Sequence, residues 1–325
     1  MTKPTTPSPP DATKTPLKIL MLHGYTQSGE LFRAKARALE KHLQKTLPAY
    51  TLSFVYPTAP IKLNPDDIPF KISPSETTTP TDSSTQTEIS AYAWWRRSTT
   101  AEPPVYLGLD TGLEAIARVL TTEGPFDGII GFSQGAACAA LVASLLEPGR
   151  RSAFAHFSTP KHASTYRTTN CAATNIPSES AGATPIAGIP FPASFEDVVG
   201  KHAPVKFVVC YSGFRAPGPR YRAFYERPGI RTPVLHVLGS LDAVVEEARS
   251  KMLIAACEGD AEAEGRVLVH PGGHFLPSQR KYLDYVGGFI GEVMNGDGKV
   301  EEDGVQGKRK QSMGEVPVED MDVPF

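Results

Sequence analysis

Short apolar runs alternate along this chain with longer segments in which apolar residues recur at helical spacing. The apolar runs have the length and branching of buried strands, and they cover residues 17–22, 51–56, 126–130, 205–211, 233–238 and 266–270. Helical patterns follow at about residues 30–47, 106–122, 134–146, 244–257 and 278–294, whereas residues 152–157 fit either a strand or a loop. This alternation predicts a single α/β domain with a mostly parallel central sheet and helices on both faces.

Four segments lack this periodicity. Residues 1–16 are rich in Thr and Pro and residues 295–325 are acidic and polar, so both are predicted to be disordered tails around a domain over residues 17–294. Low-complexity insertions occur near residues 60–90 and 158–194. The second insertion fits a cap over a site and a plain surface loop equally well.

Composition and charge indicate which partners and which cellular compartment to expect for this protein. The formal net charge of −2 gives no reason to expect nucleic acid or an anionic membrane as partner. No apolar run approaches the ~20 residues of a membrane span, and the N-terminus lacks the apolar core of a signal peptide. The four cysteines are far apart and show no CxxC spacing; they are Cys138, Cys171, Cys210 and Cys257. This spacing favours free thiols over disulfides or metal ligands, and free thiols fit a cytoplasmic location.

The most informative motif is G-x-S-x-G at residues 131–135, between a predicted buried strand and an Ala-rich helix. This context is the one that a nucleophile elbow requires, with Ser133 as the nucleophile. Gly131 and Gly135 leave room for a turn that strains the serine backbone. The backbone N–H of Gln134, at the start of the helix, is placed to bind a developing oxyanion.

A second candidate feature follows the first predicted strand, where His23 and Gly24 lead into a loop and a helix. In α/β-hydrolases this place carries the second oxyanion donor, which is here the backbone N–H of Tyr25. The side chain of His23 is interpreted as structural. Trp94 and Trp95 are interpreted mainly as residues that pack the loop before the second helix, with a place beside an acyl group as the secondary interpretation.

Two further residues complete a candidate triad. Asp242 follows the strand at 233–238, so it fits the acid of a triad and equally the N-cap of the helix at 244–257. His274 lies on a Gly-rich loop before the last helix, where its imidazole can take the serine proton. The chain order Ser133, Asp242, His274 is the order of α/β-hydrolases. Other candidates are interpreted as structural or as weaker competitors, namely Asp110, Asp127, His156, His162, Ser212 and His270.

Several motifs together resemble the FSH family of serine hydrolases, in family order over about residues 17–290. They are LHGYTQS at 22–28, AWW at 93–95, YLGLDTGL at 106–113, FDGIIGFSQGA at 126–136, YSGF at 211–214, GSLDAVV at 239–245 and GGHFLP at 272–277. The resemblance implies an α/β-hydrolase with a catalytic triad carried onto Ser133, Asp242 and His274. It implies no metal and no organic cofactor. The two insertions and both tails depart from the family pattern.

The expected function is therefore hydrolysis of a carboxylic ester or thioester through an acyl-enzyme. Resemblance to fungal members extends this expectation to release or trimming of a polyketide-type secondary metabolite, with a small-molecule substrate or one carried on a synthase. A general short-acyl carboxylesterase is the first alternative. A ligand-binding or partner-binding module on a hydrolase fold is the second. The sequence does not distinguish hydrolysis from acyl transfer, and it does not identify the substrate or the oligomeric state.

Overall fold

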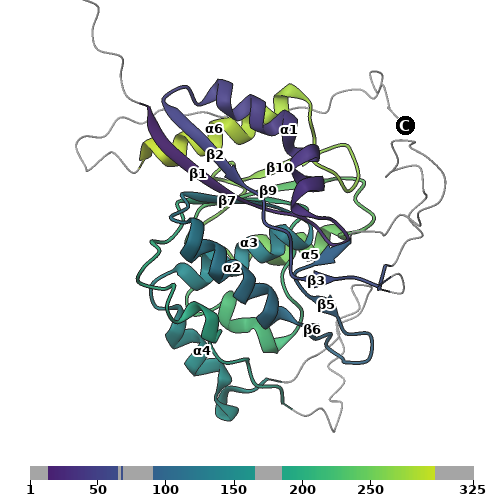
Figure 1. Ribbon diagram of the computed structural model, residues 1–325. Helices are drawn as coiled ribbons and strands as arrows, with labels where there is room; N and C mark the ends of the chain where they lie inside the picture. Colours follow the sequence, from purple (N-terminus) through teal and green to yellow (C-terminus); the bar gives the residue numbers. More distant parts are fainter. Residues whose placement is uncertain (1–13, 65–66, 69–90, 165–184, 297–325) are drawn as a thin grey trace, which may run out of the picture.

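The computed structural model describes residues 14–64, 67–68, 91–164 and 185–296 (Figure 1). Its strands are β1 (Thr15–Leu22), β2 (Tyr50–Val55), β3 (Ile61–Lys62), β4 (Tyr92–Ala93), β5 (Arg96–Arg97), β6 (Tyr106–Leu107), β7 (Gly128–Phe132), β8 (Phe207–Tyr211), β9 (Val234–Gly239) and β10 (Val267–His270). Its α-helices are α1 (Gly29–Thr46), α2 (Leu109–Glu123), α3 (Gln134–Leu146), α4 (Arg150–Ser158), α5 (Glu247–Ile254) and α6 (Arg280–Gly296). Short 3-10 turns cover Pro160–His162 (η3), Ala193–Phe195 (η4) and Pro219–Phe224 (η5).

Six strands form the central sheet in the order β10-β9-β8-β7-β1-β2, and every neighbouring pair is parallel. The predicted α/β fold with a parallel sheet is confirmed. β1 begins two residues earlier than expected, because Thr15 pairs with Tyr50 at the start of β2. The short pairs β3–β4 and β5–β6 are antiparallel and lie outside this sheet.

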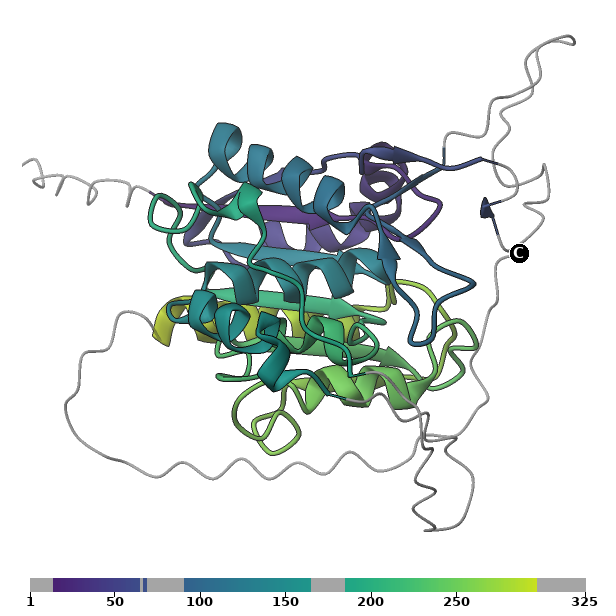
Figure 2. The same cartoon turned by 90° about the horizontal axis from the view of Figure 1, so that it is seen from below.

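Helices cover both faces of the sheet. Helices α1 and α6 lie together on one face, above β1 and β2 in Figure 1. Helices α2, α3, α4 and α5 cover the other face, which Figure 2 views from below. Alternation along β1 explains this arrangement, since Ile19 and Met21 pack with α1 and α6 while Leu20 and Leu22 pack on the α3 side.

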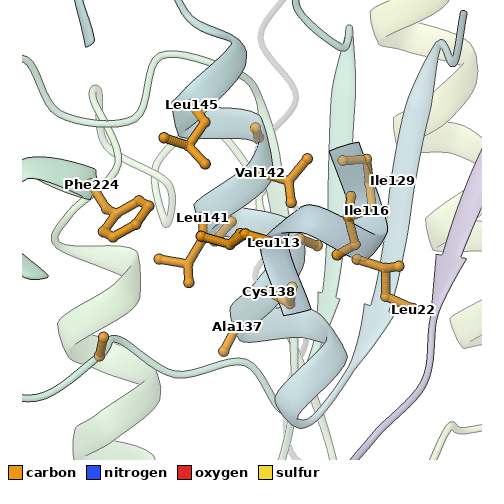
Figure 3. Close-up of a cluster of buried hydrophobic side chains, with 14 of the residues drawn as sticks. Leu22, Leu113, Ile116, Ile129, Ala137, Cys138, Leu141, Val142, Leu145 and Phe224 are labelled. Atoms are coloured by element: carbon orange, nitrogen blue, oxygen red, sulfur yellow. The ribbon is translucent and has the colours of Figure 1, made fainter. Parts of the chain in front are cut away.

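Helix α3 is the centre of the second layer, and all of its residues are buried. Its Ala-rich composition lets the neighbouring elements approach closely, while Leu141, Val142 and Leu145 fill the space between them (Figure 3). Figure 3 also shows Leu113 and Ile116 of α2 in the same cluster. A helix that is apolar all round belongs in a core, and this one carries the candidate nucleophile at its N-terminal end.

Three boundaries differ from the sequence-based expectations. Residues 152–157 lie within α4 rather than in a strand or a loop, because Ala153, Phe154 and Phe157 bury one face at helical spacing. Helix α2 begins only at Leu109, since Gly108 takes a left-handed φ of 78° and separates it from β6. Helix α5 is shorter than the expected 244–257, because a turn built on Asp242 precedes it.

The two predicted insertions are described only at their edges. Residues 65–66, 69–90 and 165–184 lie outside the described part of the chain, as do both predicted tails apart from their inner residues. At the edge of the second insertion, Ser164 bridges Ile186 and the Phe191 ring packs against Phe154 at 5.3 Å between centroids. Among the described helices, none is long and apolar enough to cross a membrane.

Candidate active site

The candidate site lies at the point where the strand order of the central sheet reverses, between β1 and β7. From β1 the chain passes through α1 to β2 at one edge, and α2 then returns it to β7 on the other side of β1. The loops that follow β1 and β7 therefore diverge at the carboxyl ends of adjacent strands. Such a switch point is where open α/β sheets bind ligands.

The turn between β7 and α3 holds Ser133 in an unusual backbone conformation, with φ 53° and ψ −116°. A conformation of this kind costs a non-glycine residue on the order of 1–3 kcal/mol. Its N–H donates to the Tyr211 carbonyl at 2.8 Å, so the end of β8 fixes the turn. Its carbonyl accepts from the N–H groups of Ala136 and Ala137, each at 3.0 Å, and starts α3.

Both glycines of the motif lie against backbone. A Cβ atom on Gly131 would lie 2.3 Å from the carbonyl oxygen of Gly135. One on Gly135 would lie 2.0 Å from the carbonyl oxygen of Leu22, at the end of β1. Neither position accepts a side chain, so the expected reason for these glycines is confirmed.

A chain of hydrogen bonds joins Ser133, His274 and Asp242. The Ser133 Oγ lies 2.9 Å from Nε2 of His274, and Nδ1 of His274 lies 2.8 Å from Oδ2 of Asp242. The carboxylate makes Nδ1 the protonated nitrogen and leaves Nε2 as an acceptor for the serine hydroxyl. The Phe132 ring packs beside the imidazole, with 4.8 Å between ring centroids.

The second oxygen of Asp242 is also satisfied. Oδ1 accepts from the N–H groups of Val244 and Val245, each at 2.9 Å. Asp242 therefore caps a turn that precedes α5, and the N-cap of α5 is Glu246. The prediction that Asp242 is the N-cap of this helix is wrong. Burial raises the pKa of Asp242, but the Val245 N–H, His274 and the Ser212 hydroxyl together bring the pKa below its ordinary value. The carboxylate is charged at neutral pH.

Close backbone packing brings the His274 loop to the end of β9. The Leu241 N–H donates to the Gly272 carbonyl at 3.0 Å, and the Ser240 N–H donates to the His270 carbonyl at 2.8 Å. A Cβ atom on Gly239 would lie 2.4 Å from the Gly273 carbonyl oxygen. Only glycine at this position lets the loops of the acid and the imidazole approach so closely.

The two predicted oxyanion donors have free N–H groups within the described part of the chain. Gly24 to Gln27 form a tight turn, in which the Gln27 N–H donates to the Gly24 carbonyl at 3.2 Å and Thr26 takes φ 68°. The Tyr25 N–H, inside this turn, has no described partner. The Gln134 N–H opens α3 and has no described partner either.

Side chains around Gln134 join the elbow to the tryptophan segment. The Gln134 amide accepts from the Trp94 N–H at 2.9 Å and donates to the Trp95 carbonyl at 2.8 Å. The Trp94 indole N–H donates to the His23 carbonyl at 2.9 Å. Trp94 and Trp95 are buried, so their predicted packing role is confirmed.

The side chain of His23 is structural, as expected. Its Nδ1 donates to the Gly24 carbonyl at 2.8 Å, and its Nε2 accepts from the Ala59 N–H at 2.9 Å. Burial lowers the pKa of His23 to about 4, although the bond to Gly24 opposes this. The imidazole is therefore neutral in the physiological range and keeps both bonds.

The competing candidates take no part in the hydrogen-bonded chain of Ser133, His274 and Asp242. His156 and His162 stack on each other at 3.7 Å between centroids, and the buried His270 accepts from the Gly272 N–H at 3.2 Å. Asp127 accepts from the Lys18 N–H, and Asp110 lies in the first turn of α2. The described residues contain no cluster of three or more His, Cys, Asp or Glu that could hold a metal ion. Of the predicted thiols, Cys138, Cys210 and Cys257 are free, and Cys171 lies outside the described residues.

Two contributions to the site were missed by the sequence analysis. Ser212, interpreted there as purely structural, has a buried hydroxyl that contributes to the low pKa of Asp242. The Gln134 side chain binds the tryptophan segment, which no local pattern indicates. Ser212 follows the end of β8 and takes a positive φ of 50°. The only sequence signal for its contribution was its place in the YSGF motif at 211–214.

Comparison with known proteins places the chain among serine hydrolases. A family model described as "Serine hydrolase (FSH1)" matches residues 12–286. Esterase OVCA2 of Danio rerio is 29% identical over 83% of this chain and 96% of its own length. A Schizosaccharomyces pombe protein named dihydrofolate reductase is 30% identical over 85% of this chain, and this chain spans only 47% of that protein.

The solved structures that are similar to this chain include acyl-protein thioesterase 2 of Zea mays, with a TM-score of 0.46 and 19% identity over 87% of this chain and 95% of that one. The family match covers most of the described domain, including all of the candidate triad and both candidate oxyanion donors. From this match we conclude that the chain belongs to the FSH family of serine hydrolases.

Proposed function

We propose that this serine hydrolase cleaves carboxylic esters or thioesters with Ser133 as nucleophile, His274 as general base and Asp242 as the acid that orients His274. The observation that carries the proposal is the hydrogen-bonded chain from Ser133 Oγ to Asp242, with distances of 2.9 and 2.8 Å. A serine on a strained turn, with an imidazole acceptor at hydrogen-bond distance, is the arrangement that acyl transfer requires.

The first half of the reaction forms an acyl-enzyme. His274 Nε2 takes the Ser133 proton as Oγ attacks the carbonyl carbon, and the carbonyl oxygen becomes an oxyanion. The N–H groups of Tyr25 and Gln134 bind that oxyanion, each contributing roughly 3 kcal/mol by analogy with measured donors. The imidazolium then protonates the leaving alcohol or thiol as its bond to carbon breaks.

The second half releases the acid. Water enters, loses a proton to His274 Nε2 and attacks the acyl carbon, and the imidazolium returns the proton to Ser133 Oγ as the ester bond breaks. Asp242 stays ionised in both halves, and its charge stabilises the imidazolium that forms twice. An alcohol in place of water would give acyl transfer with the same residues.

The substrate class is argued from resemblance. Relatives carry the name esterase, and resemblance to fungal members suggests thioesters of the polyketide type, free or carried on a synthase. A short-acyl carboxylesterase needs the same residues and differs only in the acyl group that the site accepts. The proposal therefore covers both esters and thioesters.

Labelling with a fluorophosphonate probe tests the nucleophile. We expect the wild type and the exposed-serine control Ser152→Ala to label, and Ser133→Ala and His274→Ala to lose labelling. Turnover of p-nitrophenyl esters and acyl thioesters of increasing chain length is expected to follow the same pattern. The chain-length profile separates a short-acyl esterase from an enzyme for longer acyl groups.

Two outcomes would contradict the proposal. Labelling that survives Ser133→Ala would remove this serine as the nucleophile. A folded wild-type protein that neither labels nor turns over any ester would favour a binding module on a hydrolase fold.

A further inference from the structure

A second histidine, His270, lies at the start of the loop that carries His274. His270 is the last residue of β10 and is 2% exposed. Pro271 follows it and restricts its backbone to the extended conformation of a strand end. The imidazole of His270 is therefore a buried group at the point where the loop begins.

Two contacts join this imidazole to the residues on either side of His274. Nδ1 of His270 accepts a hydrogen bond at 3.2 Å from the N–H of Gly272, which lies two residues before His274. The ring of Phe275, the residue directly after His274, packs against the imidazole with 5.1 Å between centroids. The His270 ring therefore contacts the loop both before and after His274.

The backbone at Gly272 is enclosed by these two rings. A Cβ atom on Gly272 would lie 2.3 Å from Cζ of Phe275 and 3.0 Å from Nδ1 of His270. While its N–H binds His270, its carbonyl accepts from the Leu241 N–H at 3.0 Å. Gly272 thus joins the His270 ring to the residue that precedes Asp242.

The His270 ring also contacts the helix that follows the loop. The Tyr282 ring meets it edge-on, with 5.8 Å between centroids, and Tyr282 is itself buried. Tyr282 lies in the first turn of α6, which begins at Arg280. One imidazole thus links the end of β10, the His274 loop and the start of α6, so its own rotamer is closely restricted by packing.

The hydrogen bond to Gly272 requires a neutral imidazole. A backbone N–H can only donate, so Nδ1 of His270 keeps its lone pair and the proton lies on Nε2. Burial lowers the pKa of His270, although the negative charge of Asp242 opposes this shift. The ring is therefore neutral at neutral pH and retains its acceptor.

We propose that His270 is a positioning residue for His274, acting through its Nδ1 acceptor on the Gly272 N–H. This inference rests on the proposed function and adds a residue that sets the geometry of the general base. The His274 imidazole must reach Ser133 Oγ and Asp242 Oδ2 at the same time. A displacement of about 1 Å at such a group can lower the rate by roughly 100-fold.

Two variants of similar size separate the acceptor from the ring. His270→Asn and His270→Leu both remove the packing on Phe275 and Tyr282, but only Asn places an acceptor, Oδ1, where Nδ1 stood. We expect His270→Leu to lower kcat for a p-nitrophenyl ester by roughly 10- to 100-fold, with KM within about threefold of wild type. The kcat of His270→Asn is expected to be roughly tenfold above that of His270→Leu. His156→Asn and His156→Leu, at a partly exposed histidine, are the matched controls.

Proton NMR gives a readout that does not depend on turnover. The Nδ1–H of His274, held by Asp242, is expected to give a resolved downfield resonance in the wild type, and Asp242→Asn is expected to abolish it. We expect His270→Asn to keep this resonance and His270→Leu to broaden or lose it. Should His270→Leu fail to fold, His270→Gln takes its place, because its acceptor lies one bond further from the backbone.

The outcomes are separable from those of the proposed function. Equal kcat values in His270→Asn and His270→Leu would overturn the role of the Nδ1 acceptor. A kcat that simply follows the free energy of unfolding in urea across the variants would also overturn it. In both cases Ser133-dependent turnover by the wild type leaves the hydrolase proposal in place. Absence of that turnover would instead contradict the hydrolase proposal.

Discussion

At the scale of single residues, the site depends on a few atoms held by backbone. The strained Ser133 is kept in place by bonds to Tyr211 and to the first turn of α3. Gly135 and Gly239 allow backbone contacts that no other residue permits. Strain at a residue such as Ser133 persists only where the surrounding contacts outweigh it, and here β1 and β8 contribute those contacts.

Asp242 is the residue at which a small change has the clearest expected result. Asp242→Asn keeps the size of the side chain but removes the charge that fixes the Nδ1–H tautomer of His274. By analogy with measured triads we expect kcat for ester hydrolysis to fall by about 10⁴-fold. Steady-state kinetics with a p-nitrophenyl ester measures this effect, with the exposed Asp110→Asn as control. Activity within tenfold of wild type would argue against the assignment.

At the scale of elements, α3 organises the site as well as the core. Its N-terminus presents the Gln134 N–H, while the Gln134 side chain holds the segment between β4 and β5. His23 joins the same network from the end of β1. Three segments that are distant in sequence thus depend on one buried amide for their relative positions.

Removing that amide tests the network. Gln134→Ala leaves the buried Trp94 N–H and Trp95 carbonyl without partners, and each such loss costs ~1–3 kcal/mol. We expect a lower free energy of unfolding in urea and a lower kcat/KM, even though the backbone donor at residue 134 remains. The exposed Gln44→Ala in α1 is the control. Unchanged stability would show that the amide does not hold this segment.

At the scale of the whole molecule, the sheet is stabilised by two apolar layers and contains neutral histidines. His23 lies beside the site, and His236 lies within β9. Burial lowers the pKa of His236 to about 3, with the charge of Arg266 adding to the effect. Both imidazoles must stay neutral for the folded chain to keep its core.

This arrangement predicts that acid weakens the fold. Between the ordinary histidine pKa of about 6.5 and about 4, the unfolded chain binds protons that folded His23 and His236 do not bind. The free energy of unfolding is therefore expected to fall as pH drops from 7 to 5, by roughly 2 kcal/mol per unit of pH below 6. Urea unfolding at several pH values measures the slope, and His236→Gln is expected to reduce it. A stability that is constant over this range would contradict the prediction.

Local patterns were enough to predict the six strands of the central sheet, the parallel α/β fold and the residues that the structure brings together at the candidate site, but not the short strands β3 to β6. The reason is that a nucleophile elbow and a Gly-rich loop are defined by the backbone geometry of five to seven consecutive residues. The same patterns failed at 152–157 and at the start of α5. At 152–157 the chain is helical, because Ala153 and Phe154 bury one face of α4. Helix α5 begins later than predicted, because a turn bound to Asp242 precedes it.

The sequence by itself determined the family, the sheet and the chain order Ser133, Asp242, His274. Only the tertiary structure decided that Gln134 binds the tryptophan segment and that the Trp94 indole binds the His23 carbonyl. These contacts join residues separated by 40 and 71 positions in sequence. Their proximity is set by strand order and packing of the whole sheet, which no local spacing of residue types encodes.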